Sequence, residues 1–428
     1  MSAYSAIPCA IFLPMIAFRF GRKICLILVG LDILIANIIF YCSTGIIQLI
    51  ISQASLGIHT ASLLSITVMV MSEYTSPKYR GIFLTLKAAT FFWGIWVSNA
   101  IGTFFHWKNI GILIFVCDTY NLISFFFFCE SPYWLATKGR FDECTEVHRW
   151  LKGTNEDSEN ELDKLIVSQK DHLNLKKNAF SKQTKHGHII KFLKVIISKE
   201  FYKPLVFASL PVFLYYFSGK IACAVYALDI IKKITSSEQM AYEGMLILDG
   251  VTVVGMYIGC AICRFISRRK QLILFSSAGV SFLYILSIYL YLIKFNTISG
   301  NYYVSLFLLM GFSISICCGP IILAAACSAE LAPLRYRSYF VCCLAILTNT
   351  VLATTLKISP FLFKNFGMHG TFLFYGISAN VFLCIIYKYM PETKDKTIQE
   401  IQESITGVSK NPLGKIELLP LQKPKYSK

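Results

Sequence analysis

The chain carries the same arrangement of charged residues twice, and this repeat constrains its fold more than any single motif. Each half contains a basic cluster, an acid and an arginine seven residues apart, and an acidic residue beside a proline. In the first half these are Arg19-Phe20-Gly21-Arg22-Lys23, Glu73 with Arg80, and Glu130-Ser131-Pro132. In the second half they are Arg268-Arg269-Lys270, Glu330 with Arg337, and Pro391-Glu392-Thr393. Matching landmarks between long apolar stretches are typical of membrane proteins built from internal repeats, above all transporters.

The composition indicates a chain that lies in a membrane. Hydrophobic residues make up 55% and charged residues 15%, whereas ordinary globular chains have about 25% charged residues. A spanning helix needs about 20 largely apolar residues. Such stretches recur at 1–18, 24–43, 46–72, 82–105, 109–129, 204–231, 244–263, 271–293, 301–327, 338–363 and 368–390. They are long and do not alternate, which favours helices over barrel strands. We therefore predict an all-α polytopic membrane protein with about 11 spans.

The net charge of +17 reflects this topology. If loops alternate between the two sides, most Lys and Arg residues fall on one side, in 19–23, 72–81, 130–202, 264–270, 328–337 and 388–428. The positive-inside rule places these segments, including the C-terminus, in the cytoplasm. The basic excess also attracts an anionic lipid leaflet. It therefore does not indicate nucleic-acid binding.

The repeat divides the chain into four predicted parts. They are an N-terminal bundle (1–129), a cytoplasmic loop with short amphipathic helices (130–202), a C-terminal bundle (203–390) and a cytoplasmic tail (391–428). Six spans per half would give twelve, but the second half has one more span before its basic cluster than the first. We therefore expect the sequence to lack the first transmembrane helix of the first bundle, either as a truncated gene model or as a degenerate copy.

The repeated charges fall at the cytoplasmic ends of predicted helices, where an unpaired charge is costly. Acids and bases of the two halves could bridge when the cytoplasmic side closes and separate when it opens, which predicts a latch for alternating access. The predicted latch residues are Arg22, Lys23, Glu73, Arg80, Glu130, Arg268, Arg269, Glu330, Arg337 and Glu392. The alternative is that these charges only anchor helix ends at the membrane interface.

Several motifs resemble those of the sugar porters of the major facilitator superfamily, especially the insect facilitated trehalose and glucose transporters. They are Arg19-Phe20-Gly21-Arg22-Lys23, Glu73 through Pro77 to Arg80-Gly81, Glu130-Ser131-Pro132-Tyr133-Trp134-Leu135, Ser218-Gly219 with Tyr226, Gly319-Pro320, and Pro391-Glu392-Thr393-Lys394. The resemblance implies two six-helix bundles, the first lacking its first helix here. It also implies facilitative or proton-coupled movement of a hexose or disaccharide, bound near the bilayer midplane between the halves.

The binding residues depart from that family pattern. Ala88 stands where the family usually has a Gln, Tyr215 and Tyr216 where it has two more, and Ile221 where it has an Asn. A sugar needs several buried donors and acceptors, since each unpaired polar group costs about 1–3 kcal/mol. Two alternatives therefore stay open: an organic-ion carrier of the same superfamily, and a transport-inactive membrane sensor or scaffold.

The polar and aromatic residues left in the spans are the candidate binding residues. They are Tyr215, Tyr216, Ser218, Gly219, Lys220, Tyr226 and Asn349. Lys220 needs a partner inside a membrane, either Asp249 or Asp229, unless it extends to the outer interface. Asn99 and Asn349 could bind a solute or join helices. Asp32 and Asp118 are candidate proton sites.

The sequence contains no arrangement that indicates an enzyme. It has no Walker phosphate-binding loop, no catalytic pattern around its histidines, and no Cys or His spacing suited to zinc. We expect no cofactor and no metal. The expected partners are a small solute, with a sugar favoured, the lipid bilayer, and a proton if transport is coupled. The expected location is the plasma membrane.

Overall fold

The computed structural model describes residues 2–179, 197–235, 238–332, 337–394 and 404–405. Within these ranges all regular structure is helical. The helices are α1 (Ser2–Phe20), α2 (Arg22–Tyr41), α3 (Ile46–Leu64), α4 (Ile66–Tyr74), α5 (Pro77–Phe104), α6 (Lys108–Phe127), α7 (Pro132–Thr137), α8 (Phe141–Lys152), α9 (Glu156–Ala179), α11 (Lys199–Phe217), α12 (Lys220–Val225), α13 (Ala227–Thr235), α14 (Glu238–Phe265), α15 (Arg268–Lys294), α16 (Tyr302–Ile316), the π-helix η2 (Cys317–Ile321), α17 (Ile322–Glu330), α18 (Arg337–Asn365) and α19 (Gly367–Tyr389).

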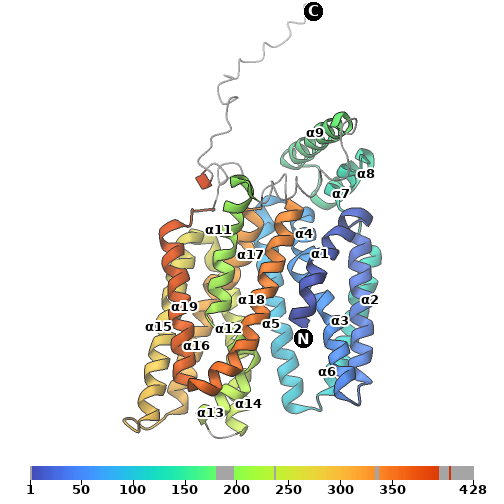
Figure 1. The fold of residues 1–428 in the computed structure, drawn as a ribbon. Helices are drawn as coiled ribbons and strands as arrows, with labels where there is room; N and C mark the ends of the chain where they lie inside the picture. Colours follow the sequence, from blue (N-terminus) through green and yellow to red (C-terminus); the bar gives the residue numbers. More distant parts are fainter. Residues whose placement is uncertain (1, 180–196, 236–237, 333–336, 395–403, 406–428) are drawn as a thin grey trace, which may run out of the picture.

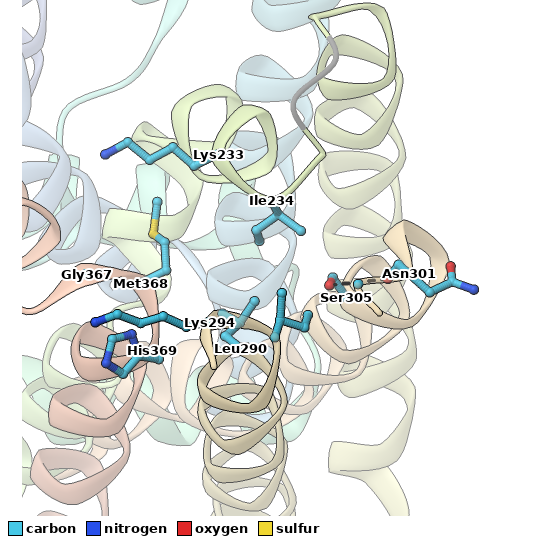
Figure 2. Close-up of a pocket in the computed structure, with 11 residues that line it drawn as sticks. Lys233, Ile234, Leu290, Lys294, Asn301, Ser305, Gly367, Met368 and His369 are labelled. Atoms are coloured by element: carbon cyan, nitrogen blue, oxygen red, sulfur yellow. Dashed lines mark hydrogen bonds between the residues drawn. The ribbon is translucent and has the colours of Figure 1, made fainter. Parts of the chain in front are cut away.

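The long helices form two bundles that stand side by side (Figure 1). One bundle contains α1–α6 and the other α11–α19, while α7–α9 lie across one end of the first bundle. We call that end of the molecule the linker end. The arrangement gives the two halves that the repeated charges predict.

Most of the predicted spans are long, apolar helices. Within the described residues, nine segments are long and apolar enough to cross a membrane: Ser2–Phe20, Arg22–Tyr41, Ile46–Tyr74, Lys108–Phe127, Glu238–Phe265, Arg268–Lys294, Tyr302–Ser328, Tyr339–Asn365 and Gly367–Tyr389. The other two predicted spans, 82–105 and 204–231, coincide with α5 and with the row α11–α13. Helices satisfy their backbone groups internally, which a hydrocarbon environment requires.

The two halves repeat the same order of elements. Helix α2 begins at Arg22 and α15 at Arg268, so each begins inside a basic cluster. The next unit is interrupted in both halves, at Ser65 between α3 and α4 and at η2 between α16 and α17. Thus α1–α6 correspond in order to α14–α19, and the second half has the further row α11–α13.

Two helix pairs make most of the interface between the halves. Helix α1 packs against α18, and α5 packs against α14. Apolar clusters continue across both contacts: Ala89 and Phe92 of α5 join the core of the second half, and Ala345 of α18 joins the core of the first. Between membrane helices such close packing replaces the hydrophobic drive that operates in water.

The α7–α9 segment packs as a small unit on the linker end. Its core contains Trp134, Leu135, Cys144 and Leu162, and the Trp134 Nε1 donates to the Phe18 carbonyl of α1 at 2.9 Å. Salt bridges at 2.8 Å join α8 to α9, from Arg149 to Glu159 and from Lys152 to Glu161. The unit is therefore tied both internally and to the first bundle.

His148 is the buried titratable group of this unit. Its side chain is 2% exposed, and its Nδ1 has no hydrogen-bond partner among the described residues. Burial lowers the pKa of His148, and the nearby Lys152 charge lowers it further, because both disfavour the imidazolium. The folded unit therefore holds this histidine neutral.

The α8–α9 packing should weaken as the pH falls. In the unfolded chain His148 titrates near its ordinary pKa of about 6.5, so below that pH the unfolded state binds more protons and folding stability drops. Hydrogen-exchange protection of α8 and α9, corrected for the intrinsic pH dependence, should therefore decrease from about pH 7 to about pH 5. The variant His148→Phe should not show the decrease. Equal protection of the wild type at both pH values would contradict a buried neutral imidazole.

Candidate functional site

A buried ion pair lies at the linker end of the first bundle. The Arg22 guanidinium donates from Nε to Glu73 Oε2 at 3.0 Å and from Nη2 to Glu73 Oε1 at 2.9 Å. Both side chains are 2% exposed. The Ala17 carbonyl accepts from Arg22 Nη1 at 3.0 Å, and Ser131 Oγ donates to Glu73 at 2.5 Å. This two-bond geometry is the strong form of an arginine–carboxylate contact, and it joins α2, α4 and the start of α7.

Glu130 caps the helix that follows the basic cluster. Its carboxylate accepts from the backbone N–H groups of Arg22 at 2.8 Å and Lys23 at 3.3 Å. Negative charge at a helix N-terminus is stabilising, because the free N–H groups point toward it. Gly21 makes room for this cap. It has a φ of 108°, and a Cβ there would lie 2.2 Å from Glu130 Oε2.

Glu392 makes the corresponding cap in the second bundle. It accepts from the backbone N–H groups of Arg268 at 3.0 Å, Arg269 at 3.1 Å and Lys394 at 3.0 Å. Burial alone would raise the pKa of Glu392. The backbone hydrogen bonds from Lys394, Arg269 and Arg268 outweigh it and hold that pKa below its ordinary value. The carboxylate is therefore kept charged at the start of α15.

Basic side chains complete the correspondence between the two halves. Lys23 Nζ donates to the Phe126 carbonyl at 2.7 Å, near the end of α6. Arg269 Nη2 donates to the Tyr387 carbonyl at 2.6 Å, near the end of α19. A cation near a helix C-terminus is stabilising because the free carbonyl groups there carry partial negative charge. The repeat is thus visible in individual contacts.

The structure places these contacts inside each half. Arg22, Lys23, Glu73 and Glu130 meet one another in the first bundle, and Arg269 and Glu392 meet in the second. The side chains of Arg80, Glu330 and Arg337 lie outside the described residues. A latch that bridges the two halves remains a prediction.

The second bundle contains a broken helix in three pieces, α11, α12 and α13. The first break is at Ser218-Gly219, where Gly219 has a φ of 76°. A Cβ at Gly219 would lie 2.3 Å from Tyr375 of α19, whose hydroxyl is 2.7 Å from Ser359 Oγ of α18. Glycine is required here both for its backbone conformation and for this close approach. Broken helices next to the interface between two repeats form the binding sites of many transporters.

The candidate binding residues surround this row. The rings of Tyr215 and Tyr216 lie 4.8 Å apart, and the Tyr226 hydroxyl donates to the Leu356 carbonyl of α18 at 3.2 Å. Ser218 Oγ donates to the Tyr215 carbonyl at 2.7 Å, at the end of α11 beside the first break. Asn349 is fully buried in α18, where its amide donates to the Ala345 carbonyl at 2.9 Å. Within the described residues its Oδ1 has no partner.

Lys220 points into the second bundle. It is 1% exposed, and its ammonium donates to Thr252 Oγ1 of α14 at 3.0 Å and to Ser313 Oγ of α16 at 2.7 Å. Of the alternatives left open for Lys220, extension to the outer interface is therefore wrong. Hydroxyl oxygens, rather than Asp229 or Asp249, hold it in the described part of the chain.

Comparison with known proteins decides the family. The model of a family described as "Sugar (and other) transporter" matches residues 4–405. The chain belongs to this family. Its members are membrane transporters and not enzymes, in agreement with the sequence-based prediction. The chain is thus a multi-pass membrane protein of the sugar porter family within the major facilitator superfamily.

Individual relatives are distant. The facilitated trehalose transporter Tret1 of Drosophila yakuba is 24% identical over 403 residues, which are 92% of this chain and 44% of the relative. The Tret1 of Bombyx mori is 26% identical over 349 residues, which are 79% of this chain and 65% of the relative. The chain thus spans less than half the length of the Drosophila yakuba protein.

Solved structures of this superfamily share the fold. The proton:xylose symporter XylE bound to 6-bromo-6-deoxy-D-glucose superposes with a TM-score of 0.75 at 16% identity, covering 94% of this chain and 87% of XylE. The human organic anion transporter MFSD10 gives a TM-score of 0.58 at 12% identity, covering 90% of this chain and 82% of MFSD10. The predicted all-helical fold of the major facilitator superfamily is confirmed.

Some residues of this sugar porter's site had no signal in the sequence. Thr252 and Ser313 hold Lys220, and Tyr375 with Ser359 shapes the break at Gly219. Hydroxyl groups are frequent in membrane helices, where many bond to their own backbone. Only the fold tells which of them meets a charged or aromatic partner.

Removing the charge of Glu73 should destabilise this transporter strongly. The variant Glu73→Gln keeps the shape of the side chain but leaves Arg22 buried without a counter-charge, a change that costs about 3–5 kcal/mol. Thermal unfolding in detergent should therefore occur at a clearly lower temperature. The matched control is Glu143→Gln, which breaks the half-exposed surface pair with Arg140, and exposed pairs contribute little to stability. Equal melting of both variants would contradict the role given to the buried pair.

Gly219→Ala should also destabilise the protein. A left-handed backbone costs a residue with a Cβ about 1–2 kcal/mol, and overpacking against Tyr375 adds about 1–3 kcal/mol. Combining it with Tyr375→Ala should cost less than the two single substitutions added together, since the clash disappears while the backbone strain stays. Gly94→Ala is the control, because a Cβ at Gly94 meets nothing within 4 Å. Melting curves in detergent measure the wild type, both single variants, the double variant and the control, and strictly additive losses would argue against the clash.

Proposed function

We propose that this chain moves a sugar, a hexose or a disaccharide such as trehalose, across the plasma membrane by alternating access. The broken helix carries the proposal. It lies in the second half, and α12 also contacts α18, one of the helices of the interface between the halves. The names of the insect relatives favour trehalose among sugars.

The aromatic side chains of the broken helix suit a sugar. Tyr215 and Tyr226 are partly buried, so each retains some accessible surface beside a break in the helix. A tyrosine offers a flat apolar face together with a hydroxyl, which matches the mixed surface of a sugar ring. The proposed binding set is Tyr215, Tyr216, Ser218, Gly219, Tyr226 and Asn349, with Lys220 behind it.

The orientation follows from the charges. The linker end carries Arg22, Arg268 and the basic segment between the bundles, so the positive-inside rule makes it cytoplasmic together with the C-terminus. The proposed latch then lies on the cytoplasmic side. Glu130 satisfies the first N–H groups of α2 within the first half, and Glu392 does the same for α15 within the second half. The halves can therefore separate at this end without leaving helix ends unpaired.

A second candidate function is transport of an organic anion. The buried ammonium of Lys220 favours it, because a fixed positive charge near the site would attract a carboxylate or phosphate. The Ala88 and Ile221 positions, which lack amides, also make a sugar site less polar than the family pattern.

Uptake measurements separate these functions. Cells that express the protein at their surface should take up labelled trehalose or glucose in a saturable way, and carnitine and organic anions should not compete. Uptake of the anion alone would support the second candidate, and surface protein with no uptake would mean a transport-inactive protein.

The same assay tests the site. Tyr226→Ala should raise the half-saturation concentration about tenfold, if the ring contributes about 1.4 kcal/mol to sugar binding. The control Tyr120→Ala changes a side chain of α6 that is 75% exposed and should leave uptake unaltered. Equal behaviour of the two variants would exclude Tyr226 from the site.

A further inference from the structure

A polar contact that includes a buried acid crosses the interface between the halves. Asn99 Nδ2 of α5 donates to Asp249 Oδ2 of α14 at 2.7 Å, and Asp249 is 5% exposed. The contacts beside it along α5 are made by neutral groups: Trp93 Nε1 donates to the Tyr257 hydroxyl, and Trp96 Nε1 to the Leu246 carbonyl. Asp249 is therefore a titratable group on the contact between α5 and α14.

The Asp249 carboxylate accepts few hydrogen bonds from the described residues. A carboxylate can accept about four hydrogen bonds, and among the described residues Asp249 accepts the one from Asn99. It forms no ion pair there, although the Lys220 charge acts on it. A charged group this poorly solvated inside a membrane marks a functional site, and proton-carrying acids are the usual case.

Hydroxyl oxygens hold Lys220 close to Asp249. The Thr252 hydroxyl donates its own hydrogen to the Leu248 carbonyl at 2.8 Å and accepts from Lys220 Nζ, as Ser313 Oγ also does. Thr252 stands three residues after Asp249 on α14, so the two side chains lie about one helical turn apart. The Lys220 nitrogen, which donates to Thr252, is therefore close to the Asp249 carboxylate.

In the part of the chain that the structure describes, Asp249 forms no ion pair with the charged residues of the helices packed against α14. Helix α16 and η2 contain no charged residue, and those of α15 stand at its two ends. On α5, Lys87 donates to the Leu63 carbonyl of α3 at 2.5 Å. The charged residues on α13 and on the rest of α14 are Asp229, Lys232, Lys233, Glu238, Glu243 and Arg264. Of the described charged groups, Lys220 is the one whose charge acts on Asp249.

We propose that Asp249 binds and releases one proton during the transport cycle. Its carboxylate takes a proton from water on one side of the membrane to become a neutral acid, and returns it to water on the other side. As an anion Asp249 accepts from Asn99; as an acid it becomes a donor. Protonation thus alters the α5–α14 contact between the halves, and it changes the charge beside Lys220, the residue directly after Gly219 at the break.

The acids of the first half offer a contrast. Asp118 accepts from Asn37, and Asp32 accepts from Ser55 at 2.6 Å. These contacts join α2 to α6 and α3, so they stay inside one bundle. Protonation of either acid would leave the interface between the halves unchanged.

Infrared difference spectroscopy tests the proton site without any need for transport. Purified protein in lipid vesicles, compared between acidic and alkaline pH, should show a carbonyl band of a protonated carboxylic acid that Asp249→Asn removes and Asp118→Asn retains. Asn99→Ala leaves Asp249 in place, so the band should remain but the pH at its midpoint should change. A wild type whose acid bands are all retained in Asp249→Asn would overturn the proposal. If Asp249→Asn does not fold, a midpoint unmoved by Asn99→Ala overturns it instead.

Transport measurements then link the site to the cycle, a step that rests on the proposed sugar transport. An inward proton gradient should stimulate sugar uptake into vesicles by the wild type and by Asp118→Asn, and Asp249→Asn should lose the stimulation. Loss in Asp118→Asn instead would overturn the proposal. A protein that shows the Asp249 band but moves no sugar would contradict the proposed function and leave the proton site standing.

Discussion

Charged side chains and free helix N–H groups at the linker end must all find partners, and the rest of the structure depends on this requirement. Lipid offers no water to a free helix N-terminus or a lone guanidinium. Each half meets this requirement alone: Glu130 caps α2, Glu392 caps α15, and Arg22 binds Glu73 inside the first bundle. The partners of these groups lie in the same half, so each half can behave as a rigid body. That independence is what movement of one half against the other requires.

The interface between the halves is apolar along most of its length, and this suits movement as well. Packing contacts such as those of Ala89 and Phe92 can slide or reform at small cost, whereas a buried ion pair would resist separation. The hydrogen bond from Asn99 to Asp249 differs from the other described polar contacts across this interface because its acceptor is an acid, and it lies next to the elements that hold Lys220. A single polar contact at such a place can bias the equilibrium between two arrangements without locking either.

The fold could be predicted further than the site. Charged residues are rare inside membrane spans, so the repeated residues Glu130 and Glu392 marked corresponding helix ends in the sequence. Their contacts to backbone N–H groups could not be foreseen, because a cap depends on the turn at Gly21 and on how the chain returns from α6. The direction of Lys220 stayed open for a similar reason. Counting residues along one helix gave its depth, but the helix restarts at Lys220 after the break, which turns the ammonium toward Thr252 and Ser313.

Distances between spin labels test most directly whether the halves move as rigid bodies. Labels at Phe20 and Phe265, the exposed ends of α1 and α14, report on the spacing of the halves at the linker end. Labels at Phe20 and Phe127 report on the first bundle alone. Unnatural amino acids should carry the labels, because the chain has 15 cysteines of its own. Added sugar should shift the Phe20–Phe265 distribution and leave the Phe20–Phe127 distribution unchanged. A shift within the first bundle, with none between the halves, would contradict the account.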